Sequence, residues 1–90
     1  MEYPYPIDES WDKDEVIDAI NFFQMVERAY EQGVKREDVL MTYTRFKQIV
    51  PSKSEEKQID KQFEKDSGYS TYRTVQKAKQ AEEGEKIKMN

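Results

Sequence analysis

The sequence predicts an all-α fold: a compact four-helix bundle with an extended N-terminal segment packed across it. Apolar residues recur at the spacing of one helix face in four separate segments. A glycine follows the first, third and fourth of these segments, and Pro51 before Ser52 separates the second from the third, as expected where one helix stops and the next begins. We expect one helical domain over residues 1–84 and a flexible C-terminal tail over residues 85–90. The predicted helices cover about 13–32, 36–50, 53–67 and 71–83.

The N-terminal segment and the first helix follow from local signals. Prolines bias residues 3–7 toward extended backbone, and we expect this segment to lie across the bundle and bury Tyr5, Ile7 or Trp11. The helix begins after Asp12, because Glu15 stands three residues on, as in a capping box. Its apolar residues form a wide face, which suits a central helix that contacts two or more neighbours.

The other helices have narrower apolar faces. The second helix gathers Val39, Tyr43, Phe46, Ile49 and Val50 on one side. The third offers only Ile59 and Phe63, so we expect a lid packed through one stripe. The fourth begins after Ser70 as N-cap and presents Tyr72, Val75 and Ala78. The chain has a single leucine, Leu40, and we therefore expect aromatic rings, 12% of the residues, to supply much of the core.

Composition excludes several classes of function. The chain has 90 residues, a net charge of -4, no Cys and no His. Thiolate nucleophiles, disulfides, His-assisted serine catalysis and ordinary zinc sites are therefore excluded. The N-terminus has no signal-peptide pattern, and no apolar run is long enough to span a membrane. We expect a cytoplasmic protein that is not an enzyme, has no cofactor and does not bind membranes.

The third helix carries a ridge of lysines spaced four residues apart: Lys53, Lys57, Lys61 and Lys65. Together with Arg73 and Lys77, this ridge makes a nucleic-acid-associated or regulatory protein the alternative function. Glu56, Asp60 and Glu64 stand three residues after successive lysines, so we expect ion pairs along a solvated face. Residues 34–90 carry a net charge of only +3, and we therefore do not expect nucleic acid as the partner.

Two acidic features are candidate sites with structural explanations. Asp8, Ser10, Asp12 and Asp14 alternate as in a calcium loop, but Lys13 stands where the turn glycine belongs and Ala19 where the bidentate glutamate belongs. We expect helix capping there and no metal. Glu27 projects into an apolar arc of the first helix, and the register of the first two helices predicts that the Tyr43 hydroxyl donates to it.

Three blocks of sequence are distinctive together: Tyr5-Pro6-Ile7-Asp8 with Ser10-Trp11, residues 45–53 with Glu55-Glu56-Lys57, and Gly68-Tyr69-Ser70 with Tyr72-Arg73. They resemble the YktA-like family of small uncharacterised bacterial proteins, and the resemblance covers nearly the whole chain. It implies a compact all-helical domain of Gram-positive bacteria. It implies no established activity, ligand or catalytic residue, and no site residue is transferred by it.

The leading hypothesis is a small non-enzymatic protein-interaction module. Its basis is a thin core, many tyrosines and no reactive set of side chains. Tyrosine and arginine are favoured at interfaces, so the candidate interaction patch is Arg45, Lys47, Lys53, Tyr69, Tyr72 and Arg73. We expect the partner to be another protein. A homodimer closed through exposed Phe22, Ile17 or Met25 is a further possibility.

Overall fold

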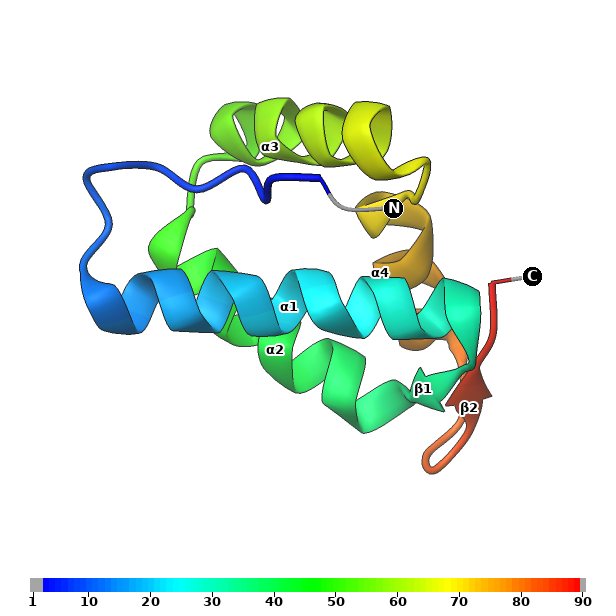
Figure 1. The fold of residues 1–90 in the computed structure, drawn as a ribbon. Helices are drawn as coiled ribbons and strands as arrows, with labels where there is room; N and C mark the ends of the chain where they lie inside the picture. Colours follow the sequence, from blue (N-terminus) through cyan, green and yellow to red (C-terminus); the bar gives the residue numbers. More distant parts are fainter. Residues whose placement is uncertain (1–2, 90) are drawn as a thin grey trace.

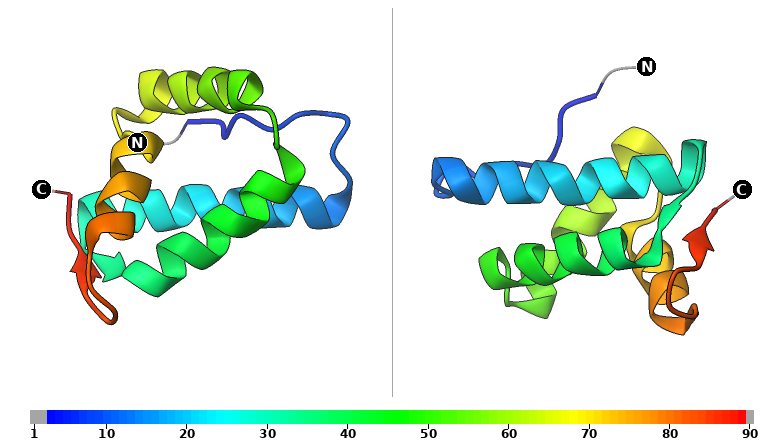
Figure 2. Two further views of the ribbon diagram at one scale, coloured as in Figure 1. Left: turned by 180° about the vertical axis from the view of Figure 1, so that it is seen from behind. Right: turned by 90° about the horizontal axis from the view of Figure 1, so that it is seen from below.

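The computed structural model describes residues 3–89 (Figure 1). Along the chain it has α1 (Lys13–Glu31), β1 (Val34–Lys35), α2 (Arg36–Ile49), α3 (Lys53–Ser67), α4 (Thr71–Gln80) and β2 (Lys86–Ile87). The predicted four-helix, all-α class is confirmed. Helices α1 and α2 run side by side in opposite directions, α3 lies over the N-terminal segment, and α4 closes one end (Figures 1 and 2). Within residues 3–89, no helix is both long enough and apolar enough to cross a membrane.

Three helices begin at the predicted caps. The Asp12 carboxylate accepts from the Glu15 N–H at 2.9 Å, and the Glu15 carboxylate accepts in return from the Asp12 N–H at 2.9 Å. The Ser52 hydroxyl accepts from the Glu55 N–H at 3.4 Å, and the Ser70 hydroxyl accepts from the Arg73 N–H at 3.1 Å. These bonds satisfy backbone donors that the first turn of a helix leaves unpaired.

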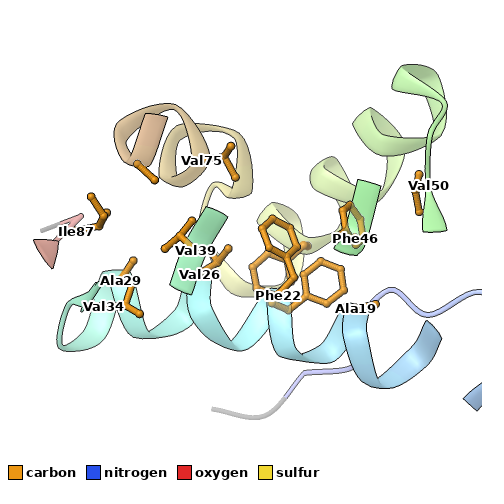
Figure 3. Packing of buried hydrophobic residues seen from close by; sticks show 13 residues of the cluster. Ala19, Phe22, Val26, Ala29, Val34, Val39, Phe46, Val50, Val75 and Ile87 are labelled. Carbon is orange, nitrogen blue, oxygen red and sulfur yellow. The ribbon is translucent and has the colours of Figure 1, made fainter. Parts of the chain in front are cut away.

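Stacked aromatic rings fill much of the core. Phe22, Phe23, Phe46 and Phe63 are buried. The Phe22 and Phe46 ring centroids lie 4.8 Å apart, which joins α1 to α2, and the Phe23 and Phe63 centroids lie 4.9 Å apart, which joins α1 to α3. Figure 3 shows Phe22 and Phe46 at the centre of the cluster, with Val39 and Val75 beyond them. Aromatic rings thus replace the missing leucines.

The N-terminal segment lies across the bundle, as predicted, and packs between α1 and α3 (Figure 1). Of the three residues expected to be buried, Tyr5 and Trp11 are half-buried and Ile7 is exposed. The Tyr5 ring stacks on Phe23 at a centroid distance of 5.7 Å, and the Tyr3 ring meets Phe63 edge-on at 5.9 Å. Both hydroxyls donate to the Glu27 carboxylate. The predicted bond from Tyr43 to Glu27 is therefore wrong, because two tyrosines from the N-terminal segment occupy this carboxylate and the Tyr43 hydroxyl donates elsewhere.

The C-terminal end differs from the predicted flexible tail. Helix α4 ends at Gln80, three residues before the predicted 83, and β2 pairs antiparallel with β1. Ile87 is fully buried opposite Val34, and the Met89 N–H donates to the Ala29 carbonyl at 2.9 Å. The segment is ordered for two reasons. Ile87 is buried in the core, and the backbone of β1 forms a two-residue pairing with β2. Residues 1, 2 and 90 of the predicted domain and tail lie outside the described residues.

Candidate functional site

A groove runs between α3 and α4, and we name it the α3–α4 groove. It consists of two adjoining hollows of about 360 and 350 Å³, which share Lys57, Asp60 and Tyr72. The larger hollow is also lined by Phe22, Tyr43, Lys53, Glu56, Thr71, Val75, Gln76 and Lys79. The smaller hollow is also lined by Gln58, Lys61 and Glu64. Each volume is at the lower end of the range for small-ligand pockets, roughly 300–1,000 Å³.

Local sequence signals place the two walls of the groove. Ser52 caps α3 directly after Pro51, so α3 turns away from the end of α2. Gly68 adopts a left-handed conformation with φ of 80°, which ends α3 and reverses the chain. Ser70 then caps α4 and makes Thr71 the first helical residue. Figure 2 shows α4 meeting the end of α3 at a steep angle.

The Glu56 carboxylate lies at the inner end of the larger hollow and is fully engaged. Its Oε2 atom accepts from the Tyr43 hydroxyl at 2.9 Å, and its Oε1 atom forms a 2.8 Å ion pair with the Lys47 ammonium. Burial and the bond to Glu56 raise the pKa of Tyr43, which therefore stays a neutral donor. The Lys79 ammonium lies 5.5 Å from the centre of the Tyr43 ring, within cation–π range. This end of the groove is a closed structural network.

Asp60 and Thr71 differ from Glu56, because each has a buried oxygen without a hydrogen bond of normal geometry, and the Thr71 hydroxyl interacts instead with the Asp60 carboxyl. Within residues 3–89, neither Asp60 Oδ1 nor Thr71 Oγ1 has a hydrogen-bond partner of normal geometry. Few buried polar atoms of native proteins are unpaired, and each one costs about 1–3 kcal/mol. Both residues line the larger hollow. The groove therefore contains two facing polar groups, one on each helix, whose oxygens keep lone pairs for a donor from outside.

The Asp60 carboxyl has an unusual protonation equilibrium. Burial raises its pKa to about 6, and the negative charges of Glu56 and Glu64 add to the rise. The Thr71 hydroxyl and the Lys47 ammonium oppose it, and both effects are smaller than that of burial. Burial is therefore the main cause of the raised pKa of Asp60, and the neighbouring carboxylates add to it although lysines stand at the rim of the groove.

The groove combines one carboxyl of unusual pKa with few partners for acid–base chemistry. A carboxyl with a pKa of about 6 has the proton affinity of a general acid or base. However, the neighbouring carboxylate of Glu56 already accepts two bonds, and the sequence has no Cys or His to act as nucleophile or second base. In the part of the chain that the structure describes, no group of three or more potential metal ligands is close enough to hold an ion.

The structure divides the predicted interaction patch. Lys53 and Tyr72 line the α3–α4 groove, and Tyr72 is 65% exposed. Lys47 lies behind the groove, where its ammonium is held by Glu56. These three residues belong to one region.

The other three predicted residues lie outside the groove. Arg45 is 3.9 Å from the Asp18 carboxylate of α1, a weak surface pair. The Tyr69 ring stacks on Tyr30 with centroids 4.5 Å apart, and its hydroxyl donates to Glu31 at 2.8 Å. Arg73 is exposed on α4. Tyr69 thus has a structural role that spacing alone did not reveal.

The structure also bears on the two other predicted surfaces, the lysine ridge of α3 and the dimer contact. All four ridge lysines are exposed, but none of them pairs with the acidic residue three positions on, within the 3–89 segment. Those predicted pairs are wrong. Glu56 and Asp60 turn inward, toward the groove, whereas Glu64 is exposed and still forms no ion pair with Lys61. The Lys77 ammonium donates to the Lys88 carbonyl. Phe22 is buried and Met25 half-buried, so only Ile17, 46% exposed, is free to serve the predicted dimer contact.

Asp60 and Thr71 are not among the candidate site residues that the sequence indicates. A signal for Asp60 was present: Glu56, Ile59, Asp60 and Phe63 have the spacing of one helix face, and Phe63 is in the core. Two acids on the stripe that packs inward predict half-buried carboxylates. No comparable signal marks Thr71, because its burial depends on where α4 packs.

Comparison with known proteins identifies relatives along the whole chain. The model of an uncharacterised protein family, UPF0223, matches residues 2–87. A UPF0223 protein of Bacillus pumilus is 56% identical over 89 residues, which cover 99% of this chain and 100% of the relative. The UPF0223 protein YktA of Bacillus subtilis is 53% identical over the same shares. A UPF0223 protein of Oceanobacillus iheyensis is 55% identical over 92% of this chain and 94% of its own.

Proposed function

The chain belongs to the uncharacterised protein family UPF0223, and on that premise we propose that it is a non-enzymatic cytoplasmic interaction module. The proposed binding surface is the α3–α4 groove, and the proposed ligand is a segment of another protein. The predicted residues Lys53 and Tyr72 belong to this surface. Arg45, Tyr69 and Arg73 are not part of it.

The position of Tyr72 is the observation that carries this proposal. Its ring is 65% exposed and stands where the two hollows meet, beside the half-buried Asp60. Tyrosine is enriched among the residues that dominate binding energy, since it combines a large apolar ring with a polar end. Two adjoining hollows that share this tyrosine can take an extended ligand that reaches both. An exposed anchor above adjoining hollows favours a peptide segment as ligand.

The chemistry of the groove supports binding without catalysis. Glu56 is occupied by Tyr43 and Lys47, which leaves Asp60 as the one inner carboxylate with a free buried oxygen among the described residues. General acid–base catalysis of a displacement needs a second group placed against the reacting atoms. The residues around Asp60 offer a hydroxyl, an amide and lysines at the rim, which are recognition groups.

Site-specific photo-crosslinking tests the proposed function. A photoreactive phenylalanine analogue at position 72 is compared with the same group at Met41, which is 50% exposed on α2 and does not line the groove. We expect position 72 alone to crosslink one defined protein in native cells. The purified partner should then bind the wild type and Met41→Ala equally, and Tyr72→Ala about 30-fold more weakly. Equal binding to all three proteins would contradict the proposal.

The alternative of a nucleic-acid-associated protein has one supporting observation, the exposure of all four ridge lysines. Acidic residues on the same helix and the engaged Lys77 weaken it. Binding of mixed DNA and RNA at low salt separates the two functions, because phosphate contacts are strongest there and weaken steeply with added salt. We expect no salt-dependent binding. A steep salt dependence that is lost when Lys57 and Lys61 become glutamine would favour the alternative.

A further inference from the structure

We propose that the α3–α4 groove takes an arginine side chain of the partner protein, whose guanidinium donates hydrogen bonds to Asp60 Oδ1 and Thr71 Oγ1. The inference rests on the proposed function and names the chemistry of the group that enters the groove. It follows from the buried acceptors, the charge around them and the shape of the hollow.

The buried acceptors supply the first step. Thr71 is only 2% exposed, and its hydroxyl oxygen is buried without a hydrogen bond of normal geometry among residues 3–89. Asp60 contributes a second unpaired oxygen from the facing helix. Both residues line the same hollow of about 360 Å³, which is open to solvent at its lysine rim. The Thr71 hydroxyl interacts with the Asp60 carboxyl, but both oxygens keep lone pairs that accept no hydrogen bond of normal geometry, so a ligand that donates to both satisfies buried acceptors on the two helices.

Charge decides the sign of the ligand. Asp60 lies between Glu56 and Glu64, one turn away on either side of the same helix. The Lys47 ammonium is already paired with Glu56, and the rim lysines Lys53, Lys57 and Lys79 are exposed to solvent, where their fields are screened. An anion that reached the buried oxygens would meet the Asp60 carboxylate, which has no paired cation among residues 3–89. A cation is attracted there, and the flexible rim lysines can turn outward to admit it.

Geometry decides between the two basic side chains. The two acceptors belong to different helices, and a planar guanidinium offers several N–H groups in a fixed fork that can reach both. A lysine ammonium is a compact point charge that is more strongly hydrated, so its transfer into a half-buried hollow costs more. The exposed Tyr72 ring at the mouth adds a surface on which a guanidinium stacks. These features together favour arginine.

Nuclear magnetic resonance with small probes tests the chemistry directly. The ¹⁵N-labelled protein is titrated with N-acetyl-arginine methylamide and with its neutral isostere, N-acetyl-citrulline methylamide. We expect the arginine probe to shift the amide signals of residues around Asp60 and Thr71, with a dissociation constant on the order of 1 mM, as one side chain without the rest of a segment provides. The citrulline probe should produce no saturable shifts.

Variants and a second probe make the test specific. Asp60→Asn should weaken arginine binding at least about tenfold, and Thr71→Val should weaken it measurably, since each removes one acceptor. Asp66→Asn is the matched control on the same helix, because Asp66 accepts from Gln62 outside the groove, and it should bind as the wild type does. Equal binding by Asp60→Asn, or binding of N-acetyl-lysine methylamide as tight as that of the arginine probe, would overturn the inference. Micromolar binding of the free probe would also overturn it, because the groove would then be a complete small-molecule site.

Failure of this inference is distinguishable from failure of the proposed function. If the partner crosslinked at position 72 binds Asp60→Asn as tightly as the wild type, the interaction module stands and the arginine assignment is wrong. If position 72 yields no partner, the proposed function fails, and the assignment of the guanidinium to a partner protein fails with it. Loss of partner binding in both Tyr72→Ala and Asp60→Asn, with Asp66→Asn unaffected, supports both proposals.

Discussion

Replacing Asp60 by asparagine should stabilise the free protein, by an amount that depends on pH. Burial raises the pKa of the Asp60 carboxyl to about 6, against roughly 3.9 in an unfolded chain. At about 1.4 kcal/mol per pKa unit the full difference corresponds to about 3 kcal/mol. Asp60 is only half-buried, so screening by solvent reduces the expected effect to about 1–1.5 kcal/mol. The side chain of asparagine keeps the shape and carries no charge.

The sign of the pH dependence follows from proton uptake. Between about pH 4 and pH 6 the folded protein holds a proton on Asp60 that the unfolded chain has released, so the stability that this proton contributes is lost as pH rises. The contribution is fully present below the unfolded pKa and absent above the folded one. The variant lacks this titration. The stability difference between Asp60→Asn and the wild type should therefore be near zero at pH 4 and reach its full size at pH 7.5.

Urea unfolding at pH 4, 5, 6 and 7.5, followed by far-ultraviolet circular dichroism, measures this difference. Charge effects from the other carboxylates are common to both proteins and cancel in the comparison. Asp66→Asn, the same kind of substitution on the same helix, is the control for the change of side chain itself. If Asp60→Asn is less stable than the wild type at pH 7.5, or the difference does not vary with pH, then the environment described for Asp60 is wrong.

Three further predictions concern the fold. Ile87→Ala should lower the free energy of unfolding in urea by about 2–4 kcal/mol, because this residue is fully buried. A loss smaller than about 0.5 kcal/mol would mean that β2 is not packed against the core. Gly33→Ala should cost about 1–2 kcal/mol in thermal melts, since φ is 95° and a Cβ would lie 2.7 Å from a side chain of β2. Gly84→Ala should lower the stability less, because Gly84 has a similar φ of 81° but open space around it. A larger loss at Gly84 than at Gly33 would contradict the close approach of β2 to Gly33. Burial and the bond to Glu27 raise the pKa of Tyr5 to about 12. Tyr5→Phe should therefore remove one late-ionising tyrosine from the ultraviolet titration. It should also lower the free energy of unfolding by about 1 kcal/mol below pH 10, because the hydrogen bond to Glu27 is lost.

The helices were predictable because their signals are local. Asp12, Ser52 and Ser70 each cap a helix through a backbone N–H three residues on, so a short stretch of sequence contains the whole interaction. The C-terminal strand was not predictable in the same way. Its pairing joins Ile87 to Val34, more than fifty positions earlier, and a strand of two residues has no periodicity to recognise.

The candidate site was likewise predictable only where it depends on local signals. The positions of Lys53 and Tyr72 at one groove require the turn at Gly68 to bring α4 back onto α3, and the sequence indicated that turn. Whether Asp60 pairs with a rim lysine or faces inward depends on the packing of α3 as a lid. Helical spacing allowed both, and the apolar stripe through Phe63 decided for the inward orientation.

The most direct test of the proposed interaction surface is photo-crosslinking at position 72 in native cells, with Met41 as the matched position and with Asp60→Asn as the second background. We predict one defined protein at position 72, its absence at position 41, and its loss when Asp60 is replaced. The same set of proteins at both positions, or none at position 72, would contradict the assignment of the α3–α4 groove as a binding surface.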